Sequence, residues 1–379
     1  MANAFKNTSQ VVRDSAILLS DNLVAANLCN RRHEQQYASK VGATIEISSV
    51  ASQTARDFVD DSSTVTDSDI TENGVDLVLS EQPYISHTIT SAQRSLELDD
   101  FNVVVTQPAI LAIRDAIDTF ILKQANRGYG RNVSGTAGVD PSTHAHILAG
   151  RKVMNDNSAP MADRIAIVNT TAAASLLDLD IFTSVDYGTE RPSGLREASM
   201  GRMAGYDFYE SQNVVDLARG DVGDATNVYG AGQALEALVN VDDGGATSTG
   251  TINAGSQFTI SGLTNTYTVV SVSGAGVAAA SGAFALTLDQ DLESAPADNA
   301  AISWVASSTG NILYCKDSLL AAIVPPQELA IGSSTAFFDG VGIRYTASTA
   351  TSTLSDQVVF DTYVGSVVQI DDAGAILQG

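Results

Sequence analysis

One stretch of the chain differs so strongly in composition from the rest that it constrains the whole architecture. Residues 211–310 contain ten acidic side chains and one basic side chain, whereas residues 101–210 contain 12 acidic and 10 basic ones. After residue 220 the sequence is also biased toward Gly, Ser, Thr and Ala. Such a shift inside a chain of 379 residues, long enough for two or three domains, predicts an independent acidic module.

Within that stretch, residues 250–306 have the pattern of a small β domain. Four short runs separated by Gly and Ser are predicted to be strands: TINAGSQFTISGL, TYTVVSVSG, GAFALTLDQDL and AAISWVA. Short strands at this spacing are typical of small β-barrels and sandwiches. We expect the chain to leave one domain near residue 220, to form the β module, and to return near residue 310.

The first 100 residues predict two segments that project from a core. Residues 1–36 form an arm whose apolar face has to cover something else; its predicted stripe consists of Ile17, Leu18, Asp21, Val24, Ala25 and Leu28. Residues 42–50 are predicted to be a strand, and residues 75–92 two short strands or one bent strand broken at Pro83. The loop between them, residues 50–74, is acidic and rich in Ser and Thr. A strand, a long acidic loop and a returning strand predict a projecting hairpin. Loops of this length in compact proteins are usually functional or disordered.

The middle of the chain predicts an α/β domain. Residues 106–128 form the clearest helix, with Pro108 in its first turn and Gly128 as a stop. A second helix is predicted over residues 139–157, with Asp140 as its N-cap. A buried strand over residues 164–169 precedes a third helix over residues 170–179, which Asn169 can cap. Residues 206–215, 312–324, 342–348 and 357–370 are expected to add further strands or α/β structure.

Composition and motifs exclude several classes of function. The net charge of −24 argues against a general nucleic-acid clamp, which needs clustered Lys and Arg. Cys29 and Cys315 are expected to be buried thiols in a reducing compartment, and the first 15 residues predict no secretory signal. His144 and His146 lie two apart on a predicted helix and so cannot share a metal there. We expect no catalytic residue, no metal and no cofactor.

Charge distribution provides the only candidates for a functional contact. Six basic side chains cluster in the α/β region: Arg114, Lys123, Arg127, Arg131, Arg151 and Lys152. They fit either salt bridges to the acidic loop of a neighbouring subunit or ordinary surface charge, and they fit a nucleic-acid contact less well. The intersubunit candidates are Asp57, Asp60 and Asp61 in the loop, and Arg114, Arg127 and Arg131 outside it.

The order of these segments resembles a known family. Residues 11–48, 69–101, 106–128 and 200–214, INAGSQFTISGL (252–263) and the final strands are similar to the major coat proteins of tailed phages with the Hong Kong 97 fold. The closest similarity is to the P-22-type coat proteins, which carry an inserted β-barrel domain.

The resemblance implies an α+β capsid fold with named parts. These are an N-terminal arm (1–36), an extended loop with peripheral-domain strands (37–100), a spine helix (101–139), an axial domain (140–219), an inserted β domain (220–310) and a return of both domains (311–379).

The resemblance also implies a non-enzymatic shell protein, assembled in the host cytoplasm and located in the virion. Its implied partners are further copies of itself in pentamers and hexamers, a scaffolding protein, a portal protein, a decoration protein in some relatives, and packaged DNA by loose non-specific contact. Two alternatives remain open at this point. The Gly/Ser/Thr-rich region also suits an acidic β-rich surface-layer or adhesin-type protein, and the strand–helix alternation suits an α/β hydrolase or nucleotide enzyme.

Overall fold

The structure of the protein is a computed structural model. It describes residues 13–19, 23–38, 44–48, 74–90, 105–130, 132–136, 139–179, 200–215, 227–230, 236–242, 252–253, 256–263, 265–272, 284–288, 291–304, 310–329, 333–338, 341–350 and 355–379.

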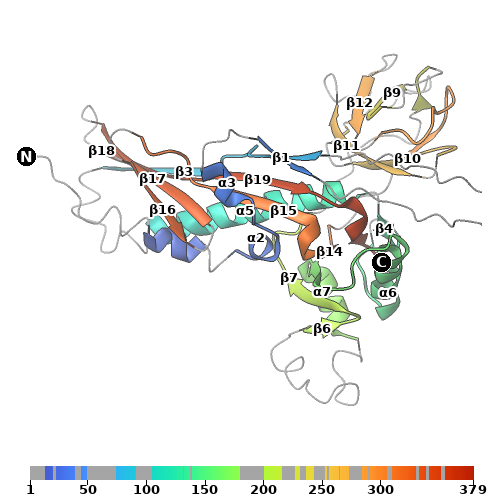
Figure 1. Ribbon diagram of the computed structural model, residues 1–379, viewed down its shortest axis with the longest axis horizontal. Coiled ribbons are helices and arrows are strands. Elements are labelled where there is room, and N and C mark those ends of the chain that lie inside the picture. Colours follow the sequence, from blue (N-terminus) through green and yellow to red (C-terminus); the bar gives the residue numbers. More distant parts are fainter. Residues whose placement is uncertain are drawn as a thin grey trace, which may run out of the picture.

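The longest described helix, α5 (Gln107–Gly128), runs along the long axis of the molecule (Figure 1). Pro108 lies in its first turn, where the missing N–H would have no helical partner anyway. Apolar residues three and four positions apart, including Ile110, Ile113, Ile117 and Ile121, form its fully buried face. The predicted helix is confirmed, although Gly128 is its last residue and Tyr129 follows as the C-cap.

A four-stranded antiparallel sheet packs beside α5. Its strands, in spatial order, are β16 (Ser333–Phe338), β17 (Val341–Ala350), β18 (Ser355–Asp361) and β3 (Tyr84–Thr90). Ile343, Val358 and Phe360 on its inner face join the same buried cluster as the apolar face of α5. The predicted strand over residues 357–370 is divided in two, because Thr362 separates β18 from β19 (Tyr363–Val368).

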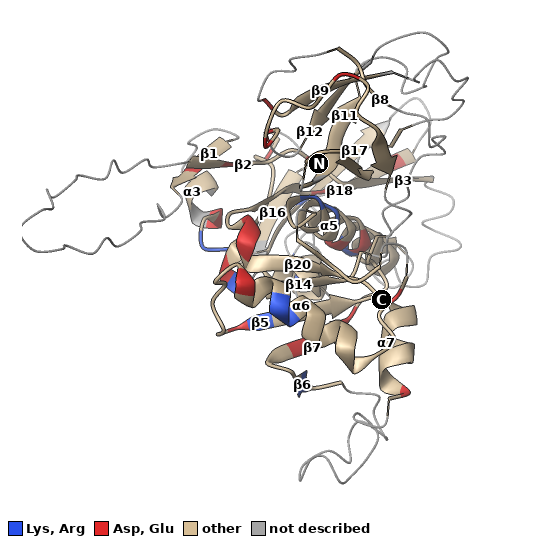
Figure 2. Ribbon diagram, turned by 90° about the vertical axis from the view of Figure 1, so that its right-hand side faces the viewer, with Lys and Arg blue, Asp and Glu red and all other residues tan. Residues whose placement is uncertain are grey.

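A smaller antiparallel pair, β15 (Leu319–Val324) and β19, carries the projecting hairpin. The hairpin consists of β1 (Thr44–Ser48) and β2 (Gly74–Val78), which pair antiparallel in the predicted order. Figure 2 shows β1 and β2 at one side of the molecule, away from β6 and β7. Strands β2 and β3 are separate, so the first of the two predicted alternatives is correct.

A second, mixed sheet forms the axial part of the fold. Its strand order is β4 (Val133–Ser134), β20 (Gly374–Leu377), β14 (Ile312–Cys315), β5 (Arg164–Val168), β7 (Tyr206–Glu210) and β6 (Arg202–Met203). Strands β5 and β7 are parallel and are connected through α7 (Thr170–Leu177), which forms the predicted α/β unit.

Both faces of this axial sheet are covered, which explains why all five residues of β5 are buried. Ile165 and Ile167 face the α5 core, while Ala166 and Val168 face α7 and a second helix, α6 (His144–Asp156). The continuous apolar run is therefore the pattern of a strand buried on two sides. Two short 3-10 turns, η3 (Lys316–Ser318) and η4 (Asp371–Ala373), complete this part.

One predicted helix cap is confirmed and the other is wrong. The side chain of Asn169 accepts a hydrogen bond of 2.7 Å from the Ala172 N–H, as predicted for α7. Helix α6, however, begins at His144 with Thr143 as its N-cap position. Asp140 lies before this N-cap position, and its carboxylate instead accepts hydrogen bonds from the side chains of Asn169 (3.1 Å) and Asn311 (3.3 Å).

The inserted β module has a core of its own. Its strands, in spatial order, are β13 (Ile302–Trp304), β10 (Gln257–Ile260), β11 (Thr266–Val272), β12 (Phe284–Leu288), β9 (Leu238–Asp242) and β8 (Asn227–Val228). A bridge between Asn227 and Ala301 brings the last strand back to the first and nearly closes a barrel. The rings of Phe258, Tyr267 and Trp304 pack at its centre in tilted pairs, with the Phe258 centroid 5.9 Å from that of Tyr267 and 5.0 Å from that of Trp304.

The arm packs on its own chain, and this corrects part of the predicted stripe. Residues 13–19 are helical, and a short separate helix, α2 (Ala25–Leu28), follows. The predicted stripe is confirmed in part, because Ala25 is buried and Leu18 and Leu28 pack against the α5 core. Ala16, Leu19 and Leu23 are also buried, whereas Ile17 is only half-buried. Val24 is half-buried, and Asp21 lies outside the described residues. The buried side chains join the α5 core, so the described part of the arm is an intramolecular layer.

Candidate interaction site at the base of the projecting hairpin

The hairpin rests on an apolar cluster that links four segments of the chain. Ile45 and Ile47 of β1 and Leu77 of β2 are buried against Leu320 and Ala322 of β15. Tyr37 of α3 (Glu34–Ala38) closes the cluster, and its hydroxyl donates a hydrogen bond to the Leu77 carbonyl. Burial raises the pKa of Tyr37 to about 12, so the hydroxyl remains a donor at neutral pH.

Strand β19 forms one side of this base. Glu81 and Val364 exchange two backbone hydrogen bonds, of 3.2 and 2.9 Å, directly after the hairpin. Gly365 allows the chains to approach closely, because a Cβ atom there would lie 2.4 Å from the Val78 carbonyl oxygen. The hairpin strand is therefore bound by its backbone as well as by its apolar side chains.

The arm forms the other side. Asn30 pairs with β15 as an isolated parallel bridge, with hydrogen bonds of 2.9 Å to Leu319 and 3.1 Å from Ala321. The buried Glu34 carboxylate accepts a hydrogen bond of 3.2 Å from the Ile323 N–H. Strand β15 is thus bordered by β19 on one side and by the arm on the other.

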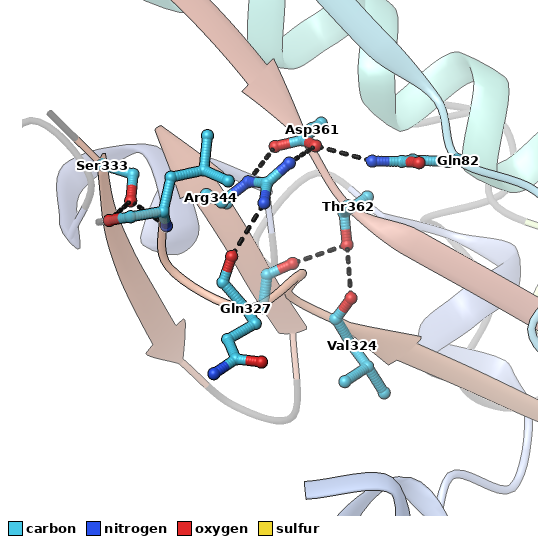
Figure 3. A network of polar contacts seen from close by, with 9 residues as sticks. Gln82, Val324, Gln327, Ser333, Arg344, Asp361 and Thr362 are labelled. Carbon is cyan, nitrogen blue, oxygen red and sulfur yellow. Dashed lines mark hydrogen bonds and ion pairs between the residues drawn. The ribbon is translucent and has the colours of Figure 1, made fainter. Parts of the chain in front are cut away.

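A buried ion pair fixes the point where the hairpin base meets the four-stranded sheet. Arg344 on β17 donates two hydrogen bonds to Asp361 on β18, of 3.0 and 2.5 Å, and a third of 2.8 Å to the Gln327 carbonyl (Figure 3). Gln82, just after the hairpin, donates to Asp361 at 2.7 Å. The side chain of Asp361 is 4% exposed. Four chain segments therefore converge on one planar, bidentate charge pair.

A second buried carboxylate holds the arm on α5. Asp118 accepts hydrogen bonds from the backbone N–H groups of Val24 (3.0 Å), Ala25 (3.1 Å) and Ala26 (3.3 Å). Burial raises the pKa of Asp118, and this outweighs the opposing effect of the three N–H donors and of Arg114. The carboxylate satisfies donors at the start of α2 that would otherwise have no helical partner.

Two of the predicted intersubunit contact residues, Arg114 and Arg127, lie in the described part of the chain, and both have contacts or burial within their own subunit. Arg114 donates to Asp115 at 2.9 and 2.5 Å, and Asn213 donates to the same oxygen at 3.2 Å. Arg127 is half-buried in the last turn of α5, and burial lowers its pKa. Asp57, Asp60, Asp61 and Arg131 lie outside the described residues. Intersubunit pairing of all six residues therefore stays a prediction.

Sequence reasoning missed the charged residues that organise this site. Asp118 lies one position after Ile117 on the buried face of a helix, and Arg344 interrupts the apolar run Val341–Ile343 at the start of a strand. For Asp118, the available signal was a charge on an otherwise apolar helix face. The partners of both residues are distant in sequence and could not be identified from local pattern.

The described residues contain no group of three His, Cys, Asp or Glu side chains arranged to hold a metal ion. The thiols of Cys29 and Cys315 are buried, as predicted, and burial raises the pKa of both. None of the described helices is long and apolar enough to cross a membrane. What the described site offers is a base for β1 and β2 that is held by buried apolar side chains and backbone hydrogen bonds.

Comparison with known proteins gives structural but not sequence matches. No protein-family model and no curated protein matches the chain. The structure titled "Mycobacterium phage Che8" matches with a TM-score of 0.55 and 15% identity, covering 94% of this chain and 90% of that one. Two further matches are titled "Asymmetric unit of bacteriophage PhiM1 mature capsid" (TM-score 0.45, 12% identity, 89% and 82% covered) and "Capsid of native GTA particle computed with C5 symmetry" (0.46, 7%, 89% and 85%). The predicted fold class is confirmed.

Proposed function

We propose, from the premise that this chain has the capsid fold of tailed phages, that it is the major capsid protein of a tailed double-stranded DNA phage. The observation that carries the proposal is the shared fold with the Che8 phage structure, which extends over 94% of the chain. The role is structural, not enzymatic, and its place is the shell of the virion. The inserted barrel supports kinship with the P-22-type coat proteins.

In this proposal the subunit joins pentamers and hexamers of an icosahedral shell. A shell subunit needs large surfaces for its neighbours, and the hairpin base described above directs β1 and β2 outward from a rigid support. We propose for the chain the same six parts that the sequence predicts, from the arm at 1–36 to the return at 311–379. A scaffolding protein, a portal protein and a decoration protein are the proposed partners besides the subunit itself.

The charge of the chain is consistent with loose contact to packaged DNA. A net charge of −24 makes the average electrostatic interaction with phosphate repulsive. A shell of such subunits would enclose a polyanion without binding it tightly, so DNA would remain free to move during packaging.

The proposal is tested by imaging the purified protein by negative-stain electron microscopy, alone and together with the products of neighbouring genes. We expect closed shells or hexameric sheets. Dispersed monomers under all conditions, including the presence of a scaffolding candidate, would contradict a capsid role.

We also propose that the acidic loop lies over the adjacent subunit and pairs Asp57, Asp60 or Asp61 with Arg114, Arg127 or Arg131 there. The variant Asp60→Asn/Asp61→Asn removes two of these charges. Exposed ion pairs contribute up to about 1 kcal/mol each, so losing roughly 1 kcal/mol per subunit raises the concentration needed for assembly about fivefold.

A matched control is Glu236→Gln/Asp291→Asn, which removes two exposed charges from the β module. It changes the net charge equally and should leave the assembly concentration near that of the unmodified protein. If both double variants shift assembly by the same factor, general repulsion, and not loop pairing, governs the effect.

A further inference from the structure

Strand β3 forms one edge of the four-stranded sheet and has unusual chemistry for an edge. It lies beside β18 in Figure 1, and within the described residues no strand pairs with its other side. Its sequence, Tyr-Ile-Ser-His-Thr-Ile-Thr, contains no Pro, Lys, Arg, Asp or Glu. Tyr84 is 69% exposed, and Ser86, His87 and Thr88 are exposed too. Proteins usually protect such edges with charge, Pro, bulges or a covering segment.

The register shows which backbone groups face outward. Glu81 and Val364 exchange both hydrogen bonds, and the Thr362 N–H donates to the Pro83 carbonyl at 3.3 Å. This ladder continues without a shift through β3 and β18. Hydrogen-bonded pairs alternate in an antiparallel ladder, so Ile85, His87 and Ile89 direct their backbone groups toward β18. The N–H and C=O groups of Tyr84, Ser86, Thr88 and Thr90 therefore point away from the sheet.

The opposite edge of the same sheet provides a contrast. On β16, the Thr335 N–H donates a hydrogen bond of 2.8 Å to the Glu328 carboxylate. The same carboxylate accepts a second hydrogen bond, of 3.0 Å, from the Thr335 hydroxyl. These hydrogen bonds lower the pKa of Glu328, so the blocking group is charged at neutral pH. A carboxylate thus occupies the β16 edge, and no described side chain does the same at β3.

Two features of β3 point to a second copy of this chain as its partner. Copies with a net charge of −24 repel each other, and an uncharged strand is where that repulsion is weakest. The strand is also nearly symmetric about His87: Ile85 mirrors Ile89, and Ser86 mirrors Thr88. A twofold contact requires such self-complementarity, because each residue must meet its mirror partner.

We infer that β3 pairs antiparallel with β3 of a second copy across a twofold axis that passes through His87. In this register Ser86 hydrogen-bonds with Thr88 of the second copy, and Tyr84 with Thr90. These four residues are the ones whose backbone N–H and C=O groups face outward. The proposed register therefore pairs residues that are able to form the hydrogen bonds. The two His87 residues face each other at the non-hydrogen-bonded position, where the Cα atoms are about 4.5 Å apart.

The contact is small, and its strength depends on the rest of the assembly. A pair of short strands alone is marginal in water. Copies already held close by other surfaces raise the effective concentration of the second strand, and the same pairing then becomes stable. The inference goes beyond the proposed function, because a shell could form with or without this contact.

Cysteine cross-linking tests the register directly. In a His87→Cys variant the two thiols face each other within disulfide range. In the control Ser86→Cys, a position that is also exposed, the thiols lie on diagonal positions beyond about 7 Å. We expect about tenfold more covalent dimer from the first variant under mild oxidation. The unmodified protein supplies the background, since Cys29 and Cys315 are buried.

A second pair of variants separates strand pairing from accidental collision. Thr88→Pro removes an outward N–H and leaves the ladder with β18 intact, whereas Thr88→Ala keeps the N–H. Added to His87→Cys, the Pro substitution should abolish the covalent dimer and the Ala substitution should preserve it. Equal cross-linking at positions 86 and 87, or an undiminished dimer with Thr88→Pro, would overturn the inference.

The experiment is carried out both on the soluble protein and on any assembled shells. Shells that form without the His87→Cys cross-link would disprove the strand contact and leave the capsid proposal standing. A register-specific dimer in a protein that never forms shells would support the strand contact and contradict the capsid proposal.

Discussion

The carboxylate of Asp361 is almost completely buried and accepts hydrogen bonds from the side chains of Arg344 and Gln82. Arg344 binds it in bidentate fashion, Gln82 adds a third hydrogen bond, and the second guanidinium arm of Arg344 reaches Gln327 (Figure 3). A buried charge pair adds little stability compared with apolar residues of the same volume, but breaking it leaves an uncompensated charge.

We call the part of the described chain outside the β module the body. We therefore predict that Asp361→Asn lowers the free energy of unfolding of the body by about 3–5 kcal/mol. The free energy of unfolding is measured by urea titration followed by far-ultraviolet circular dichroism. Arg202→Met is the control, because the Arg202–Asp207 pair is 3.8 Å apart and its side chains are 61% and 44% exposed. Its loss should cost less than about 1 kcal/mol. An Asp361→Asn effect no larger than that of the control would mean that the network is not a structural junction.

Asp118 leads to a prediction about pH. Its pKa is raised in the folded chain by burial, so the folded state holds the proton more tightly than the unfolded state. The resulting stabilisation is complete below the unfolded pKa and is lost as the pH rises through the folded pKa. An Asp118→Asn variant cannot lose that contribution. We expect its stability relative to the unmodified protein to increase as the pH rises above the unfolded pKa of about 4, measured by urea titration at several pH values. A constant difference would show that Asp118 titrates normally.

At the scale of elements, Gly365 determines how close β2 and β19 can lie. A Cβ atom there would lie 2.4 Å from the Val78 carbonyl oxygen, and backbone cannot move aside cheaply. We predict that Gly365→Ala lowers stability by about 1–3 kcal/mol through overpacking. Amide hydrogen exchange should accelerate most in β1 and β2.

Gly374→Ala is the comparison for that variant. Its Cβ would lie 2.3 Å from the Tyr129 ring, in the axial sheet and away from the hairpin. Exchange should then rise in β14 and β20 and remain slow in β1 and β2. Identical exchange patterns in the two variants would indicate global destabilisation, not release of the hairpin.

At the scale of the whole molecule, the β module enters and leaves the body at one place. A Cβ atom on Gly310 would lie 2.1 Å from the Val215 carbonyl oxygen, so the outgoing and returning segments touch. The Gln257 side chain donates a hydrogen bond of 3.3 Å to the Gly130 carbonyl at the same junction. The module has a separate apolar core, which includes Trp304, the single tryptophan of the protein.

We predict that the module and the body unfold in separate transitions. Trp304 fluorescence reports the module alone, whereas far-ultraviolet circular dichroism at 222 nm is dominated by the helices of the body. Asp361→Asn should shift the transition seen by circular dichroism and leave the transition seen by Trp304 fluorescence unchanged. A single transition that moves in both signals would show that the two units unfold cooperatively.

Local pattern was sufficient to predict much of the architecture. Alternation over residues 44–48, the apolar periodicity of α5, the Asn169 cap and the compositional break before the barrel are all encoded within short windows. Each depends on interactions between residues that are close in sequence, so each can be predicted from a short stretch of the chain.

Only the tertiary structure decided how those elements meet. The Asp140 carboxylate was available for a helix cap, but Asn169 and Asn311, both far away in sequence, bind it instead. The buried face of the arm also includes Ala16 and Leu19, which pack into the α5 core, and the Asp118 carboxylate accepts hydrogen bonds from the backbone at the start of α2. The partner of a buried charge is set by which segments come together in space. The sequence by itself therefore determined the elements and their order, and folding determined the contacts between them, because those contacts join residues that no local window contains.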